Sequence, residues 1–174
     1  MKKQFYVVVV FITVFLFFQS HIFRIDCSKE LKWLRDIKYD KAIYYNYNCS
    51  EKCKDSLVCD FQIIDSLNVL ANTVEIPGIE LKFKSAKEII NLVTRNKFYK
   101  SKGIEEGTGC YTPISAIVFY SSLQKPLASI NFSQDCFQIE IINYNGYTVY
   151  HKYFYELGKE KLVTIFKREK LKGC

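Results

Sequence analysis

The fold of this chain is decided by residues 110–140, which read CYTPISAIVFYSSLQKPLASINFSQDCFQIE. The run AIVFY at residues 116–120 is apolar throughout, and the run ASINF at residues 128–132 alternates between apolar and polar side chains. Between them, SSLQKP at residues 121–126 has the composition of a turn, so the stretch predicts a β-hairpin. We expect its first strand to be central, with both faces buried, and its second strand to be half exposed.

The composition predicts one globular domain that contains a sheet and helices. The 174 residues are 49% hydrophobic and 16% aromatic, which excludes a disordered chain and suffices for one core. Strand-like runs also occur at residues 42–47, 58–64, 74–83, 137–142 and 147–155. Apolar residues at helical spacing predict helices over residues 86–96 and 157–170, and a short one over residues 27–38. We therefore predict an α+β fold, in which two helices pack on an antiparallel sheet of about five to seven strands.

The helix over residues 86–96 is preceded by a pattern that marks helix starts. Ser85-Ala-Lys-Glu88 is a capping box, in which the Ser hydroxyl and the Glu carboxylate accept bonds from free backbone amides. We therefore expect Ser85 to be the N-cap and the helix to begin at Ala86.

The first 20 residues have the pattern of an export signal. Met1-Lys2-Lys3 is basic and residues 5–18 are almost wholly apolar, like the n-region and h-region of a signal peptide. The run is shorter than the roughly 20 residues that span a bilayer, but residues 22–25 extend it. A retained N-terminal anchor and a lipid-anchored Cys27 therefore stay as alternatives to cleavage. All three predict that residues 28–174 form a domain outside the cytoplasm, which is periplasmic, secreted or attached to a membrane.

Seven cysteines in an exported chain favour disulfide bonds. Folding the hairpin back at its midpoint places Cys110 opposite Cys136, which predicts a structural bond between them. Cys49, Cys53 and Cys59 lie in a polar loop, where disulfides are favoured over a metal site because no fourth zinc ligand is indicated. We therefore predict no metal and no cofactor, with free thiols or a redox-active Cys110 and Cys136 as the alternatives.

The hairpin resembles one in a family of small exported bacterial proteins that is largely uncharacterised. That family carries Cys-Phe-x-Pro-Arg-His, then an apolar strand ending in Phe-Tyr, a turn, and Ile-Cys-Phe-x-Cys. The matching residues here are Cys110-Tyr-Thr-Pro113, Phe119-Tyr120 and Cys136-Phe137, within a similarity that extends over residues 76–172.

The chain also departs from that family at three positions. Ile114 and Ser115 stand where the family has Arg and His, and Ile139 stands where it has the second late Cys. The resemblance therefore implies a scaffold and an exported location, and it implies no activity.

Two sets of residues are candidates for a site. With Asn145-Gly146 as a two-residue hairpin turn, Glu140 faces His151, and a carboxylate beside an imidazole can orient it as a general base. Such cross-strand neighbours also occur where they serve strand pairing alone. The second candidate is a binding surface made of tyrosines, which offer a large contact area with a polar tip. Its members are Tyr144, Tyr147, Tyr150 and Tyr153, and plain packing of a sheet is the alternative.

The formal net charge is +7, and much of the excess lies near the end of the chain. The basic residues there are Lys159, Lys161, Lys167, Arg168, Lys170 and Lys172. Such a run is typical of a solvated helix face, and contact with phosphate or anionic lipid is the alternative. Export argues against nucleic acid as a partner. We expect a non-enzymatic domain that binds another protein or an envelope component, as an immunity or inhibitor protein does. The alternative is an enzyme that uses a thiol or the pair of Glu140 and His151.

Peptide mapping of the oxidised chain without reductant is expected to find Cys110 joined to Cys136, because the hairpin brings both ends of the stretch together. Digestion after reduction, which should release the two peptides separately, is the control. A bond from Cys110 to Cys49, Cys53 or Cys59 would contradict the predicted pairing.

Overall fold

The structure is a computed structural model that describes residues 30–47, 63–64, 70–71, 74–95, 99–100, 113–133 and 138–172, with Tyr99, Lys100 and Tyr153 described by their backbone alone. The strands are β1 Lys41–Asn46, β2 Ile79–Glu80, β3 Tyr99–Lys100, β4 Pro113–Tyr120, β5 Pro126–Ser133, β6 Gln138–Asn143 and β7 Thr148–Phe154. The helices are α3 Lys32–Arg35, α4 Phe83–Val93 and α5 Glu156–Glu169.

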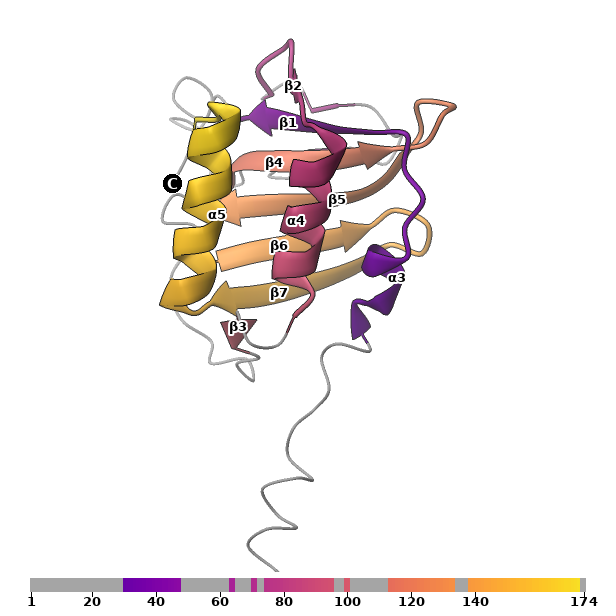
Figure 1. Cartoon of the computed structure of the whole chain (residues 1–174). Coiled ribbons are helices and arrows are strands. Elements are labelled where there is room, and N and C mark those ends of the chain that lie inside the picture. The colour runs from indigo at the N-terminus through magenta and orange to yellow at the C-terminus, as the bar shows by residue number, and fades with distance from the viewer. Residues whose placement is uncertain are drawn as a thin grey trace, which may run out of the picture.

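Within these residues, seven strands form one antiparallel sheet in the order β2-β1-β4-β5-β6-β7-β3. Figure 1 shows α4 and α5 lying side by side across one face of that sheet. The α+β fold, the antiparallel sheet and the two packing helices predicted from the sequence are confirmed.

The connections explain why both helices lie across the strands on this face. β2 and β3 are the two edge strands, so α4, which follows β2 and precedes β3, crosses the sheet from one edge toward the other. α5 follows β7 and returns toward β1 (Figure 1), where the Tyr44 hydroxyl donates to the carbonyl of Lys172. Beside β1, Gly78 lies so close that an added Cβ would be 2.5 Å from Ile43 Cγ2, so only glycine fits there.

The predicted hairpin is formed by β4 and β5, but β5 is not half exposed. Except for Ile114 and Leu127, every residue of both strands is buried. The polar residues of β5 are tolerated because they have partners: the Ser129 hydroxyl lies 3.0 Å from that of Tyr144, and Asn131 Nδ2 donates to a neighbouring carboxylate. The prediction of a half-exposed strand was therefore wrong, because it treated polarity as exposure.

The register of this hairpin agrees with the prediction at its open end. Pro113 lies opposite Ser133, which is the register assumed in the prediction, whereas Cys110 and Cys136 lie outside the described residues. Irregularities beside Pro113 and Phe119 shift the intervening pairs by one residue, so that Ile117 faces Ile130.

The second hairpin has the predicted register and a different turn. Glu140 faces His151, as expected, but the ladder ends at Asn143 and Thr148 and leaves a four-residue turn. Tyr147, rather than the Asn145-Gly146 pair, adopts the left-handed conformation with φ 40°. The two-residue turn predicted from Asn-Gly was therefore wrong.

Two of the predicted helices differ from expectation at their ends. α4 begins at Phe83 with Lys82 as its N-cap, and no side chain caps it, so the predicted capping box at Ser85 was wrong. The short helix α3 ends at Arg35, although Leu31 and Leu34 are buried as its spacing predicted. α5 lies within one residue of its predicted bounds at each end.

The main core lies between the sheet and the helices, and Phe166 of α5 is at its centre. Its ring makes edge-to-face contacts with Tyr44 of β1 at 5.6 Å and with Phe132 of β5 at 5.3 Å between centroids. A second apolar cluster covers the β1–β4 half of the opposite face. Its buried members are Tyr45, Tyr47, Ile63, Ile64, Val74, Ala116, Val118 and Tyr120.

Several predictions fall on residues that the structure does not describe. They are the export signal, the strand over residues 58–62 and every predicted disulfide, because Cys27, Cys49, Cys53, Cys59, Cys110, Cys136 and Cys174 all lie outside the described residues. Among the residues that are described, no helix is both long and apolar enough to cross a membrane.

Replacing Phe166 by Ala is expected to lower the free energy of unfolding by about 3–5 kcal/mol, because it leaves a cavity between α5 and the sheet. Leu157→Ala on the same helix is the matched control; Leu157 is 51% exposed, and its loss should cost less than about 0.5 kcal/mol. Urea unfolding measures both, and equal costs would contradict this packing.

Candidate functional site

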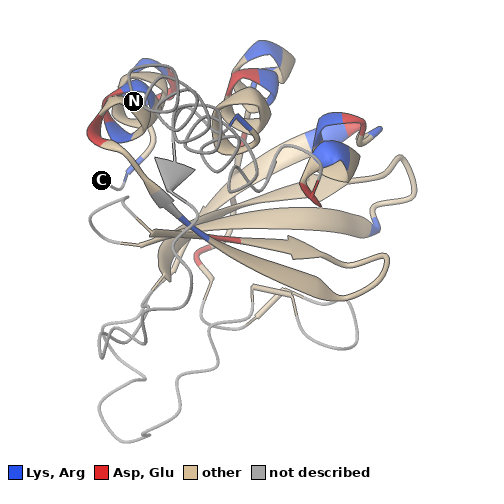
Figure 2. Cartoon of the chain, turned by 90° about the horizontal axis from the view of Figure 1, so that it is seen from below, with Lys and Arg blue, Asp and Glu red and all other residues tan. Residues whose placement is uncertain are grey.

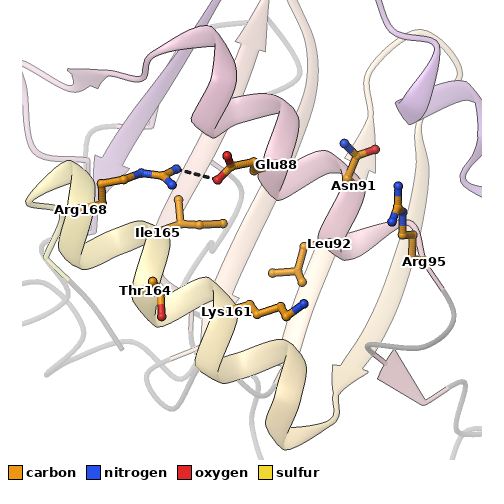
Figure 3. Close-up of a pocket in the computed structure, with 8 residues that line it drawn as sticks. All are labelled: Glu88, Asn91, Leu92, Arg95, Lys161, Thr164, Ile165 and Arg168. Carbon is orange, nitrogen blue, oxygen red and sulfur yellow. Dashed lines mark hydrogen bonds and ion pairs between the residues drawn. The ribbon is translucent and has the colours of Figure 1, made fainter.

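A groove of about 350 Å³ lies between α4 and α5 on the side of the helices that faces away from the sheet (Figure 3). It is lined by Glu88, Asn91, Leu92 and Arg95 from the first helix and its C-terminal end, and by Lys161, Thr164, Ile165 and Arg168 from the second. Each set follows the spacing i, i+3, i+4, i+7, so each helix contributes one stripe of side chains.

The base of the groove is apolar and its edges are charged or polar. Leu92 and Ile165 lie between the helices and are 4% and 6% exposed, while the surrounding lining residues carry polar ends. One edge offers the amide of Asn91, and the opposite edge offers the hydroxyl of Thr164, which donates to Glu160 O at 2.8 Å. Because so little of this base is exposed, the arrangement offers a partner mainly hydrogen bonds and ionic contacts.

One end of the groove is closed by a network that joins the two helices. Arg168 Nη2 donates to Glu88 Oε2 at 2.7 Å and to Ser85 Oγ at 2.9 Å. Ser85 Oγ in turn donates to Glu169 Oε1 at 2.6 Å. The bond to Glu88 raises the pKa of the Arg168 guanidinium, which holds its charge. Ser85 and Glu88 therefore serve the contact between helices, which is why they do not form the predicted capping box.

The other end of the groove is cationic. Arg95 and Lys161 line it from opposite helices. Arg95 is exposed and makes no ion pair with any residue that the structure describes. A carboxylate or phosphate entering this end would meet two positive charges.

The helices carry nearly all of the excess positive charge in the described residues. Residues 82–95 contain four Lys or Arg and one Glu, and residues 156–172 contain six Lys or Arg and three Glu. Ten cations against four carboxylates leave these two segments with a charge of +6, whereas the strands of the sheet carry few charges (Figure 2). The groove therefore lies in the basic layer of the molecule.

The predicted pair of Glu140 and His151 lies on the opposite face of the sheet. His151 Nδ1 is 3.9 Å from Glu140 Oε1, and the two side chains are 62% and 17% exposed. Buried Asn131 donates to Glu140 Oε2 at 2.7 Å and so orients the carboxylate, while its own Oδ1 has no hydrogen-bond partner among the residues that the structure describes. The structure thus brings together the two residues that the sequence paired, and adds Asn131 as a third.

The four predicted tyrosines do not share one face of the sheet. Tyr150 packs on the helix side against Trp33, at 6.3 Å between ring centroids. Tyr144 belongs to the opposite side, where it packs against the second apolar cluster, and burial raises its pKa. Tyr147 is 57% exposed on the turn between β6 and β7, and the side chain of Tyr153 lies outside the description.

Sequence reasoning missed the groove because its two stripes are far apart in the chain. The basic residues near the C-terminus were interpreted as a solvated helix face, and the partner stripe at residues 88–95 was interpreted only as part of a helix. The available signal was the polar and apolar mixture at positions i, i+3, i+4 and i+7 of both helices. Among the described residues, no three His, Cys, Asp or Glu side chains are grouped to hold a metal ion.

Comparison of this chain with known protein families, with curated proteins and with solved structures finds no match. The resemblance of the hairpin to a family of exported proteins therefore stays a prediction. The groove and the Glu140–His151 pair have to be interpreted from their own chemistry.

Ser85→Ala is expected to lower the free energy of unfolding by about 1–3 kcal/mol, because Glu169, whose side chain is 8% exposed, loses a hydrogen-bond donor. In a chain that already carries Glu169→Gln the same substitution should cost less, since the two residues act together. A double-mutant cycle measured by urea unfolding tests this coupling. Equal costs in both backgrounds would instead favour a local role of Ser85 within α4.

Proposed function

We propose that this chain is an exported binding domain, which holds another protein or an envelope component in the groove between α4 and α5. An immunity or inhibitor protein is one form that such a domain takes. The export part of the proposal is supported by the basic start and the apolar run at residues 5–18.

The groove is the observation that carries the binding role. Two arginines, Arg95 and Arg168, border it, and arginine is one of the residue types enriched at protein interfaces. Arginine is enriched at the residues that contribute most to protein–protein binding, because its planar group forms paired hydrogen bonds and also packs against apolar surface. The side chains of the groove can bind a partner through contacts alone, and such binding requires no proton transfer.

An enzyme that uses Glu140 and His151 is the second candidate. The observation that favours it is the bond from Asn131 to Glu140, which orients a carboxylate toward an imidazole, as a general base requires. Ile139 and Ile141 face the helices, so Glu140 and its neighbour His151 lie on the opposite face of the sheet from the groove, and the two candidates can be tested separately.

Photo-crosslinking in cells that produce the full chain tests the binding role. With p-benzoylphenylalanine in place of Asn91, on the edge of the groove, we expect one discrete crosslinked partner that mass spectrometry can identify. The matched control carries the same group in place of Tyr147, which is exposed on the turn between β6 and β7, and should give no such product.

A crosslink from position 147 without one from position 91 would contradict the groove and favour the predicted tyrosine surface instead. The doubly substituted chain with Glu140→Gln and His151→Ala should capture the same partner through position 91. Loss of that capture would place the function on the opposite face of the sheet.

A further inference from the structure

We infer that the β2–α4 edge of the domain contacts the surface of an anionic lipid bilayer. This edge consists of Ile76, Ile79 and Phe83 together with Lys82 and Lys84. Its apolar side chains enter the boundary between head groups and acyl chains, and its two lysines contact the phosphates. None of the five residues lines the groove between α4 and α5, so the inference is independent of the proposed function.

The apolar side chains of the β2–α4 edge are exposed. Ile76 is 73% exposed, Ile79 is 42% exposed and Phe83 is 66% exposed. One side of the Phe83 ring stacks on Tyr39, at 5.4 Å between centroids and 26° between planes, so the ring is held while the rest of it faces solvent. Exposed apolar side chains that lie together with a polar rim mark sites of interaction with proteins or membranes.

The two carboxylates of this stretch are directed away from Phe83. Ile79 pairs with Tyr44 of β1, whose ring belongs to the core on the helix side of the sheet. Because side chains alternate along a strand, Glu80 lies on the other side of the sheet. Glu75 accepts a hydrogen bond from the side chain of Asn46 at 3.1 Å. The helix side of the edge is therefore apolar and basic.

Lys82 and Lys84 flank Phe83 in the sequence and supply the charge of the edge. Both lysines are exposed, and neither forms an ion pair with a residue that the structure describes. Lysine suits a bilayer surface, because its alkyl stem lies along apolar groups while its ammonium stays among the phosphates. Each such lysine adds to the attraction of an anionic leaflet.

The shape of the β2–α4 edge favours a bilayer over a protein as its partner. Figure 1 shows the loop before β2 and the start of α4 at the margin of the sheet, where they project from the domain. Residues that contribute most to protein–protein binding cluster in well-packed pockets. A bilayer surface needs no matching shape, so a projecting edge with an apolar tip and flanking lysines suits it better.

The predicted N-terminal run is a second contact with the same surface. The extended run ends at residue 25, and the described chain begins at residue 30. From there the chain follows α4: Lys87 Nζ donates to the carbonyl of Arg35 at 3.0 Å, and Tyr39 stacks on Phe83. A run that is retained in the bilayer therefore keeps the edge close to it, and stable attachment to a membrane takes two such contacts.

Quenching by brominated lipid tests this contact in the full chain. Trp33, the one tryptophan, is first replaced by Phe, because its Nε1 has no hydrogen-bond partner among the described residues. Phe83→Trp then places a reporter at the edge and keeps an aromatic ring against Tyr39. In vesicles of phosphatidylglycerol and brominated phosphatidylcholine it should lose about half of the emission seen with unbrominated lipid, because apolar groups of such a contact lie about 5–10 Å deep.

Leu157→Trp in the same background is the matched control. Leu157 is also an exposed apolar residue in the first turn of a helix, but α5 follows β7, on the far side of the sheet from β2. Its emission should change by less than about a tenth. Because both chains carry the same N-terminal run, a difference between them reports the edge and not the run.

The lysines are tested in the chain that carries Phe83→Trp. Lys82→Gln and Lys84→Gln should each shift the equilibrium about fivefold toward an edge that is free of the bilayer, because each removes one attraction to anionic lipid. Lys82→Arg and Lys84→Arg keep the charge and should keep the quenching. Brominated phosphatidylcholine alone should quench less than the anionic mixture. Circular dichroism of each variant confirms that the fold is retained.

Several outcomes would overturn the inference. Equal quenching at positions 83 and 157, no quenching at position 83, or unchanged quenching after both Gln substitutions would each exclude contact of the edge with an anionic bilayer. An unquenched position 83 that crosslinks to a protein through p-benzoylphenylalanine would assign the edge to a protein partner instead. Crosslinking through position 91 of the groove is a separate measurement, so none of these outcomes decides the proposed function.

Discussion

The structure depends on the burial of both faces of the β4–β5 hairpin. Except for Ile114 and Leu127, every residue of these two strands is buried, so the sheet requires a cover on each side. α4 and α5 supply one cover, with Phe166 inserted between Tyr44 and Phe132. The second apolar cluster covers part of the other face. Burial of these apolar side chains is a favourable contribution to the free energy of folding.

Burying one stripe of each helix in the core leaves another stripe of each facing outward, and the groove is formed by these outer stripes. α4 and α5 lie next to each other because the connections bring both across the same face of the sheet. The polar side chains between the two helices therefore have to form hydrogen bonds or ion pairs with one another. At one end they do so through Ser85, Glu88, Arg168 and Glu169. At the other end Arg95 and Lys161 line the groove from opposite helices, so the helix pair that closes the core also forms the groove of the proposed binding role.

The tyrosines show that residue type alone does not separate a packed sheet from a binding surface. Tyr44, Tyr45 and Tyr47 are all less than 9% exposed, and their rings fill the two sides of β1. Tyrosine suits this position because its ring packs in a sheet while its hydroxyl finds a partner, as the 3.2 Å contact between the Tyr45 and Tyr120 hydroxyls shows. Much of the tyrosine content is therefore explained by the core.

The sequence by itself determined the two hairpins, the existence of α4 and α5, and the facing of Glu140 and His151, because turn residues and apolar periodicity act over a few residues. Only the tertiary structure decided that β5 is buried on both faces and that Ser85 bonds to Glu169, 84 residues away, instead of capping α4. It also decided that the stripes ending at Arg95 and Arg168 form one groove. These features arise from contacts between segments far apart in the chain, and local patterns carry no information about which distant side chain will lie opposite.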